Sequence, residues 1–372
     1  MSPARNPAVE RALDAGRVLV VCGSGGVGKT TTAAALALAA AARGRAALVC
    51  TIDPSRRLAT SLGLRQLSSR PRRLPIARAV PAAKGKLWAM TLDTRRTFDA
   101  LVERHAPDPA TRKRILENSF YREVSSALQG SHEYMAMEKL LDLASDPRFD
   151  LVVLDTPPTR HALDFLEAPD RLLGFLDASV LRFFLRPYFV AGRLTLRVAS
   201  RTGAAALRLA DRYLGLGFLE QLSEFFLSFE GMYDGFKQRA AQVHALLRSE
   251  GSNFVLVTSA SPSALAEARY FHARLAERRM PFAALIVNRL HAPPRARRAG
   301  RAPAGPGVTL DAELRRRLVE ICRDQQLLAD AERRRVNALS VDLGVPVARV
   351  PELESDVHDL RGLNEVARAL LA

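Results

Sequence analysis

The sequence predicts an α/β protein built on a doubly wound, mostly parallel sheet, and three observations lead to this fold class. Short apolar runs rich in Val, Leu and Ile recur along the 372 residues without regular polar alternation, as expected for strands that are buried on both faces. Helical patterns lie between several of these runs, and strand–helix alternation is typical of parallel sheets. A glycine-rich turn joins the first run directly to the first helical pattern.

Each expected element follows from its composition and spacing. The clearest helical patterns are 30–43 and 263–279, whereas 291–308, rich in proline, glycine and arginine, predicts a mobile loop. The expected strands are seven apolar runs, at 17–22, 46–52, 87–92, 150–155, 253–259, 282–288 and 346–350.

The longest intervals without an expected strand are helical in pattern and predict a subdomain inserted into the sheet domain. We expect the discontinuous sheet core to comprise residues 1–94, 150–168 and 251–372. The helical subdomain would then comprise 95–149 and 169–250. The sequence contains no internal repeat, and only one glycine-rich turn of this kind is present.

The net charge of +16 comes from arginine, since the chain has 49 arginines and 6 lysines. A solvated basic surface is the simplest interpretation. A nucleic-acid groove would interleave aromatic with basic residues, and only 6% of the residues are aromatic. We therefore expect no specific nucleic-acid partner, while attraction to an anionic membrane surface or an acidic protein stays open.

Cysteine usage and hydropathy indicate the cellular compartment in which the protein is expected. Cys22, Cys50 and Cys322 are far apart, which argues against a disulfide scaffold and fits a reducing environment. No apolar run reaches the ~20 residues that span a bilayer, and the first fifteen residues lack the apolar segment of a signal peptide. We expect a cytoplasmic protein that could lie peripherally on a membrane.

The glycine-rich turn matches the phosphate-loop pattern G-x-x-x-x-G-K-[ST] between a strand and a helix. Its backbone amides would surround phosphates, Lys29 would neutralise their charge, and the Thr30 hydroxyl could ligate Mg²⁺. A dinucleotide site is the competing interpretation, but it has no use for Lys29 and Thr30 at the helix start. The residues expected to bind ATP here are Gly23, Ser24, Gly25, Gly26, Val27, Gly28, Lys29, Thr30 and Thr31.

Two acidic residues end expected strands, at the sheet edge where α/β proteins bind ligands. Asp155, with Thr156 beside it, is expected to hold Mg²⁺ directly or through water. Asp53 would orient or deprotonate the attacking water. Either carboxylate could instead cap a following helix, and for Asp53 this alternative is a serious rival.

Five motifs occur in the order seen in the ArsA family of arsenite-pump and guided-entry ATPases, and the chain resembles that family over nearly its whole length. They are GSGGVGKT, TIDPSRRL, DTPPTRHALDFLEAP, LIVNRL and VPEL…DLRGL. The resemblance implies a dimeric ATPase with a helical subdomain that closes on ATP. It also implies that Asp53 positions water, that Asn288 recognises adenine, and that Pro351 and Glu352 begin a loop over the base. Glu133 is a weaker correspondence, because Gln129 replaces the family's proline.

Departures from the family pattern concern charge and metals. Ser24 stands where the family has a lysine that reaches the neighbouring protomer's nucleotide, so a homodimer would lack that lysine at both sites. Two alternatives follow from the missing lysine. The chain could form a heterodimer with a lysine-bearing paralogue, or it could hydrolyse ATP slowly with the help of Arg56 or Arg57. Pro157 and Arg160 also stand where the family's switch II segment usually has Ala and Gly. No C-x-x-C pair follows Asn288, and three scattered cysteines make an arsenite site improbable.

The stretch 181–229 combines arginines at helical spacing with many apolar side chains, among them Phe184 and Phe189. It could bind a hydrophobic helix or a membrane surface, or it could pack inside its own subdomain, which is the commoner case. Three uses of ATP therefore compete: handling a hydrophobic or membrane-protein client, energising an anion efflux pump, and regulation through a partner. A non-enzymatic ATP-binding module is the remaining class.

Overall fold

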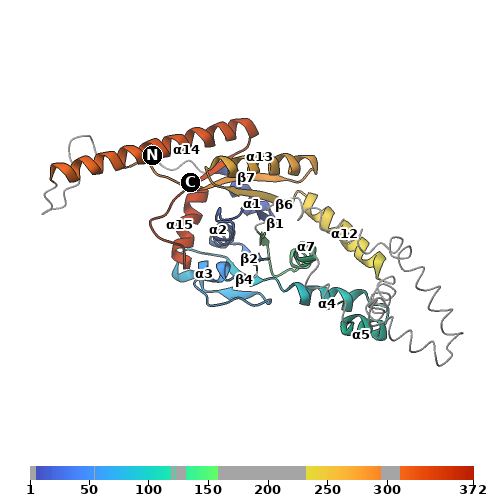
Figure 1. The fold of residues 1–372 in the computed structure, drawn as a ribbon. Helices are drawn as coiled ribbons and strands as arrows, with labels where there is room; N and C mark the ends of the chain where they lie inside the picture. The colour runs from blue at the N-terminus through green and yellow to red at the C-terminus, as the bar shows by residue number, and fades with distance from the viewer. Residues whose placement is uncertain (1–5, 54, 119–120, 122–130, 158–231, 295–310) are drawn as a thin grey trace, which may run out of the picture. The chain divides into compact units, whose positions relative to one another are not determined.

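A computed structural model describes residues 6–53, 55–118, 121, 131–157, 232–294 and 311–372. It contains an eight-stranded sheet of order β3-β4-β2-β5-β1-β6-β7-β8 (Figure 1). All pairs are parallel except β3 with β4. The strands are β1 (Val18–Cys22), β2 (Ala46–Thr51), β3 (Arg72–Leu74), β4 (Lys86–Thr91), β5 (Leu151–Asp155), β6 (Ser252–Thr258), β7 (Phe282–Leu290) and β8 (Val347–Pro351).

The predicted fold class is confirmed, and each of the seven expected runs forms a parallel strand. The strand not foreseen is β3, an edge strand in which only Leu74 is buried. Its other two residues, Arg72 and Arg73, are exposed, so the segment lacks the apolar run by which a strand is recognised. Residues 291–294 have no regular structure, and the remainder of the expected loop at 291–308 lies outside the described residues.

The chain divides into two compact units, and most of the helices within the described residues belong to the first. Unit 1 comprises Met1–Thr91, Ala144–Ala162 and Leu247–Ala372, and unit 2 comprises Leu92–Leu143 and Leu163–Leu246. The helices of unit 1 are α1 (Pro7–Ala15), α2 (Lys29–Ala42), α3 (Arg57–Ser61), the 3₁₀ turn η1 (Ile76–Arg78), α13 (Pro262–Glu277), α14 (Ala312–Leu343) and α15 (Leu360–Leu371).

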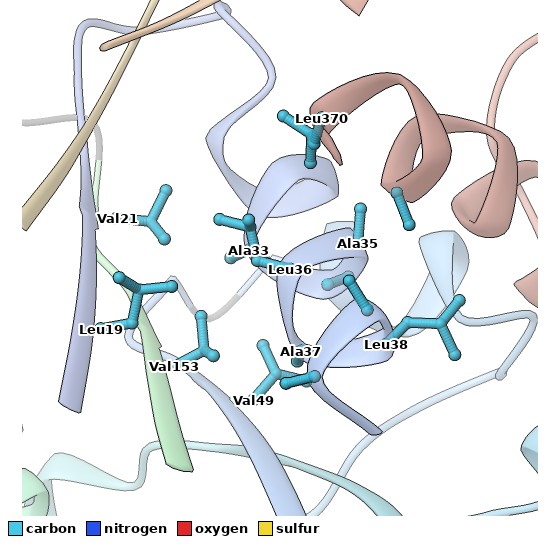
Figure 2. Close-up of a cluster of buried hydrophobic side chains, with 14 of the residues drawn as sticks. Leu19, Val21, Ala33, Ala35, Leu36, Ala37, Leu38, Val49, Val153 and Leu370 are labelled. Atoms are coloured by element: carbon cyan, nitrogen blue, oxygen red, sulfur yellow. The ribbon is translucent and has the colours of Figure 1, made fainter. Parts of the chain in front are cut away.

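Helix α2 is the centre of the unit 1 core. Its residues from Ala33 to Ala41 are all buried, as expected of a helix that is apolar on every side. Its neighbours include β2, β5 and α15, and the small alanine side chains allow such close packing. Figure 2 shows this helix beside Leu19, Val49 and Val153 of the sheet and Leu370 of α15. The core therefore fixes the start of α2, and with it the phosphate-loop sequence, against the centre of the sheet.

The described part of unit 2 is helical. Aromatic side chains form its core, with Phe98, Tyr121, Tyr134 and Phe236 in one buried cluster. The Arg239 side chain contacts both Glu138 and Asp142 at 2.8 Å. Its helices are α4 (Thr94–His105), α5 (Pro109–Glu117), α7 (Ser131–Ala144) and α12 (Tyr233–Arg248). No helix in the described segments is long and apolar enough to cross a membrane.

Candidate nucleotide-binding site

The loop between β1 and α2 depends on glycine at two positions. Gly23 and Gly28 have φ angles of +145° and +93°, a region that side chains disfavour. A Cβ atom on Gly23 would lie 2.0 Å from the Val257 carbonyl oxygen, and one on Gly28 would lie 2.2 Å from Asn288 Nδ2. The loop consequently packs against β6 and β7 more closely than any side chain would allow.

Lys29 is the first residue of α2, and its ammonium group lies within the loop. Its Nζ donates a hydrogen bond to the Ser24 carbonyl at 2.7 Å, and only 6% of the residue is exposed. Burial lowers the pKa of Lys29, which the nearby Asp155 carboxylate partly counteracts. This geometry keeps a cation at the point where the loop amides and the α2 N-terminus favour an anion.

Asp155 ends β5 at the same edge of the sheet, and it is fully buried. Its Oδ2 accepts a hydrogen bond from the Thr51 hydroxyl at 2.8 Å, whereas its Oδ1 accepts none from the described residues. Burial raises the pKa of Asp155 to about 6, and the Thr51 and Thr30 hydroxyls and Lys29 act in the opposite direction. A buried carboxylate oxygen without a partner, close to a threonine hydroxyl, suits a hard cation such as Mg²⁺.

Thr156 and Pro157 continue the chain beyond this carboxylate. The Thr156 hydroxyl donates to the Val21 carbonyl at 2.9 Å, which ties the end of β5 to β1. Pro157 is half-buried, and Arg160 lies outside the described residues. The short tether through Thr156 fixes the backbone immediately after Asp155.

Asp53 follows β2 and is half-buried. Its Oδ1 accepts from the Ser55 amide at 2.8 Å, and its Oδ2 lies 3.8 Å from Arg57 Nη1. The carboxylate thus closes a local turn, although the residue that precedes α3 is Arg56. Asp53 is therefore not the N-cap of α3, and its Oδ2 faces a guanidinium group.

The opposite wall comes from β7, β8 and the segment after β8. Asn288 Nδ2 donates to the Val27 carbonyl at 2.9 Å. The Glu352 amide donates to the Leu290 carbonyl at 2.9 Å, and the Glu352 carboxylate lies 3.5 Å from His291 Nε2. These contacts hold Asn288 and Glu352 beside the phosphate-loop sequence, more than 250 residues away along the chain.

A cavity of about 810 Å³ lies between these walls, within the size range of small-molecule sites. Of the residues expected to bind ATP or its metal, those that line it are Gly26, Gly28, Lys29, Thr30, Thr31, Asp53, Asn288, Pro351 and Glu352. Those that do not line it are Gly23, Ser24, Gly25, Val27 and Asp155. Asp155 lies behind the surface because it is fully buried, and the four loop residues lie at neighbouring hollows.

Several lining residues were not identified from the sequence. Thr60 and Ser61 enter from α3, Arg289 from β7, and Ser355 from the segment after β8. Thr51, which holds Asp155, was missed as well. Arg289 could have been identified from the sequence, because it directly follows Asn288. The positions of Thr51, Thr60, Ser61 and Ser355 depend on how strands and helices meet in space.

The remaining predicted features lie elsewhere in the chain. Glu133 is half-buried on α7 in unit 2. Cys22 and Cys50 are buried on β1 and β2, and Cys322 is exposed on α14. The stretch 181–229 and Gln129 lie outside the described residues.

Comparison with known proteins identifies relatives over most of the chain. A family model described as anion-transporting ATPase matches residues 16–298. ATPase GET3C of Arabidopsis thaliana is 26% identical over 285 residues, which cover 72% of this chain and 65% of that protein. ATPase GET3B of the same plant is 27% identical over 168 residues, or 44% of this chain and 35% of that protein.

An archaeal relative carries a different name. The putative arsenical pump-driving ATPase of Halobacterium salinarum is 30% identical over 167 residues, covering 44% of this chain and 26% of that protein. The chain therefore spans less than two thirds of the length of these curated relatives. The family match itself contains the phosphate loop, Asp53, Asp155 and Asn288. The chain belongs to the ArsA family of anion-transporting ATPases, which are ATP hydrolases.

Proposed function

We propose that this chain binds ATP with Mg²⁺ in the 810 Å³ cavity and hydrolyses it to ADP and phosphate. The observation that carries the proposal is that Lys29, which begins α2 at the glycine loop, and Asp155, which ends β5, are both buried side chains of opposite charge that influence one another electrostatically. Lys29 supplies a fixed positive charge for the phosphates, and Asp155 presents a buried oxygen without a hydrogen bond.

The roles of the other groups follow from their positions. The Thr30 hydroxyl and Asp155 would hold Mg²⁺, which supplies positive charge to the bound phosphates. Asp53 lines the cavity, where its carboxylate would orient the attacking water and accept its proton. Asn288 would recognise the base, and Pro351 and Glu352 would border it.

Calorimetry and phosphate release test this proposal in two stages. Titration of Mg²⁺ and ATP into the protein should give a binding signal that Lys29→Ala abolishes. Asp53→Asn should retain binding but lose phosphate release, because the amide cannot accept the proton. Binding without any release by the unmodified protein would identify an ATP-binding module instead of an enzyme.

We further propose that the ATP cycle acts as a conformational switch in a dimer, either of this chain or with a related ATPase that carries the lysine absent at Ser24. Ser24 contributes a carbonyl to Lys29, but its short side chain cannot carry a charge to a neighbouring site. Mixing the chain with a lysine-bearing paralogue should raise phosphate release above that of either protein alone. An unchanged rate would argue against the mixed pair.

We propose that the chain uses the ATP cycle to handle a hydrophobic or membrane-protein client. We also propose that it is a cytoplasmic protein that associates peripherally with membranes. The pattern of residues 181–229 supports this, as do the relatives named GET3. Energising an anion pump is the second candidate, favoured by the relative named as a pump-driving ATPase. Replacing Phe184 and Phe189 with Asp should abolish binding of a hydrophobic helix or liposomes while ATP binding persists. Loss of folding would instead place this surface in the core.

A further inference from the structure

The edge of the sheet at β3 carries a concentration of positive charge. β3 is the outermost strand at this end of the sheet, next to β4 (Figure 1). Between Asp53 and Asp93 the chain has nine basic residues and no acidic one, against a net charge of +16 for all 372 residues. Six of the nine lie on β3, on η1 or at the start of β4, or within two residues of these elements, and they are named the basic edge. They are Arg70, Arg72, Arg73, Arg78, Lys84 and Lys86.

The charges of the basic edge are not compensated within the described residues. All six residues are exposed, and none forms an ion pair with a residue that the structure describes. Arg73 pairs with Trp88 of β4, and side chains alternate between the two faces along a strand. Arg73 and Lys86 therefore lie on one face of this edge and Arg72 on the other, so positive charge surrounds the edge strand.

Protection of an exposed edge strand against pairing with other chains is the simpler role for such charges. It accounts for Arg72 and Arg73, the two basic residues on β3 itself. Arg78 lies on η1, and Lys84 precedes β4, so both add charge away from the unpaired side of β3. The extent of the charged surface thus favours a binding role in addition to protection.

We propose that the basic edge binds the anionic headgroups of a membrane surface. This binding is the electrostatic part of the peripheral membrane association proposed above, on which it rests. Lipid phosphate and carboxylate groups would lie against the guanidinium and ammonium groups, and each basic residue near such a surface strengthens binding by about fivefold. Apolar contacts made elsewhere in the chain would add to this attraction.

The composition of the basic edge favours a membrane over a protein or a nucleic acid. No large apolar side chain of residues 70–86 is exposed, whereas protein interfaces are built around apolar and aromatic anchors. Residues 70–86 also contain no aromatic residue and no α-helix. Single-stranded nucleic acids stack on aromatic side chains, and duplexes are commonly read by a helix in the major groove. A layer of headgroups requires only exposed positive charge.

Cosedimentation of the full chain with vesicles, without nucleotide, tests this binding. The unmodified protein should bind vesicles of phosphatidylcholine with phosphatidylserine more tightly than vesicles of phosphatidylcholine alone. The difference should vanish in about 1 M salt, which screens exposed charges. A variant with Arg72→Glu and Arg73→Glu should bind the anionic vesicles at least about tenfold more weakly. A variant with Arg72→Lys and Arg73→Lys should bind as the unmodified protein does, because it retains the charge.

The matched control is a variant with Arg315→Glu and Arg316→Glu on α14. These two arginines are also adjacent, exposed and without an ion pair among the described residues, so the change in net charge is the same. The control should stay within about threefold of the unmodified protein, because screening confines the attraction to charges near the membrane. An equal loss in both variants would show that only net charge matters, and would overturn the proposal.

Circular dichroism of each variant checks that the fold is retained. Should the two substitutions on β3 unfold the protein, a variant with Lys84→Glu and Lys86→Glu takes their place, with the same expected loss. Binding to anionic vesicles that survives both pairs of substitutions would overturn the proposal.

ATP binding is a separate property of the chain. Calorimetry should find it unchanged after Arg72→Glu and Arg73→Glu, because neither residue lines the cavity. An unmodified protein that does not bind anionic vesicles would overturn both the basic edge as a membrane site and the peripheral association, but not ATP hydrolysis. Vesicle binding that equals the control after Arg72→Glu and Arg73→Glu would overturn the basic edge alone. Tighter binding of duplex DNA or of an acidic polypeptide than of the vesicles would overturn the choice of a membrane.

Discussion

The Thr51 hydroxyl donates to Asp155 Oδ2 at 2.8 Å, while the second oxygen of this buried carboxylate accepts no hydrogen bond from the described residues. The two side chains come from neighbouring parallel strands, β2 and β5, which are in register at Thr51 and Asp155. The bond satisfies one oxygen of the carboxylate and leaves the other without a hydrogen bond from the described residues. Thr51 is therefore a positioning residue for the proposed metal ligand.

Thr51→Val should weaken both the fold and the binding of Mg²⁺ with ATP. The substitution leaves a buried carboxylate without its donor, at a cost of about 1–3 kcal/mol. Urea unfolding measures the stability, and calorimetry measures the affinity. Thr51→Ser, which retains the hydroxyl, is the control. Equal behaviour of the two variants would mean that the hydroxyl does not position Asp155.

Gly28→Ala should lower ATP affinity by at least about tenfold. The left-handed backbone disfavours a side chain by about 1–2 kcal/mol, and the new Cβ would lie 2.2 Å from Asn288 Nδ2. Gly26 also has a positive φ, but nothing lies within 4 Å of a Cβ there. Calorimetry should therefore find a smaller loss for Gly26→Ala, and the opposite order would contradict the packing argument.

Leu36→Ala should reduce the free energy of unfolding by about 2–5 kcal/mol, because Leu36 is fully buried at the centre of α2. Leu327→Ala is the matched surface control, since Leu327 is 58% exposed and should change stability by less than about 0.5 kcal/mol. Chemical denaturation of both variants measures the difference. A small effect at Leu36 would show that the core relaxes around the lost side chain.

His105→Phe should make the protein less sensitive to acid. Burial lowers the pKa of His105, and its Nε2 has no hydrogen-bond partner within the described part of the chain. Because the unfolded state binds the proton at a higher pH than the folded state, His105 destabilises the fold as the pH falls below about 6.5. The stability above that pH should be little affected by the ionisation.

Thermal unfolding between pH 8 and pH 5 measures this dependence. The melting temperature of the unmodified protein should fall more steeply below pH 6.5 than that of His105→Phe. The phenyl ring preserves the ring contact with Phe236, whose centroid lies 6.0 Å from that of His105. Parallel pH profiles would show that His105 does not contribute.

Ser24→Lys should raise phosphate release several-fold if two copies of the chain close on ATP, since each would then offer a cation to the other's phosphates. Ser24→Ala is the control, because Ser24 contacts Lys29 through its carbonyl and not through its hydroxyl. Steady-state phosphate assays compare the variants. Equal rates would argue against trans donation at this position.

The sequence by itself determined the parallel α/β fold, the seven parallel strands and the phosphate-loop motif with its flanking elements. These follow from local patterns, because buried strands such as 150–155 and the turn before Lys29 carry their signals within a few residues. The functional roles of Asp53, Asn288 and Glu352 stay predictions. The long helix α14 was missed, although Asp311, which caps it, and Gly344, which ends it in a left-handed conformation, mark its limits.

Only the tertiary structure decided which distant groups meet. Strand order places Thr51 beside Asp155, and the approach of β7 places Asn288 against Gly28. The same holds for His291, whose Nδ1 lies 2.9 Å from Glu332 Oε1 of α14. Such contacts join residues from about 40 to 260 positions apart, so they depend on packing between elements and not on any local pattern. Packing also decided which half of α14 is buried, since one amphipathic face runs through both halves.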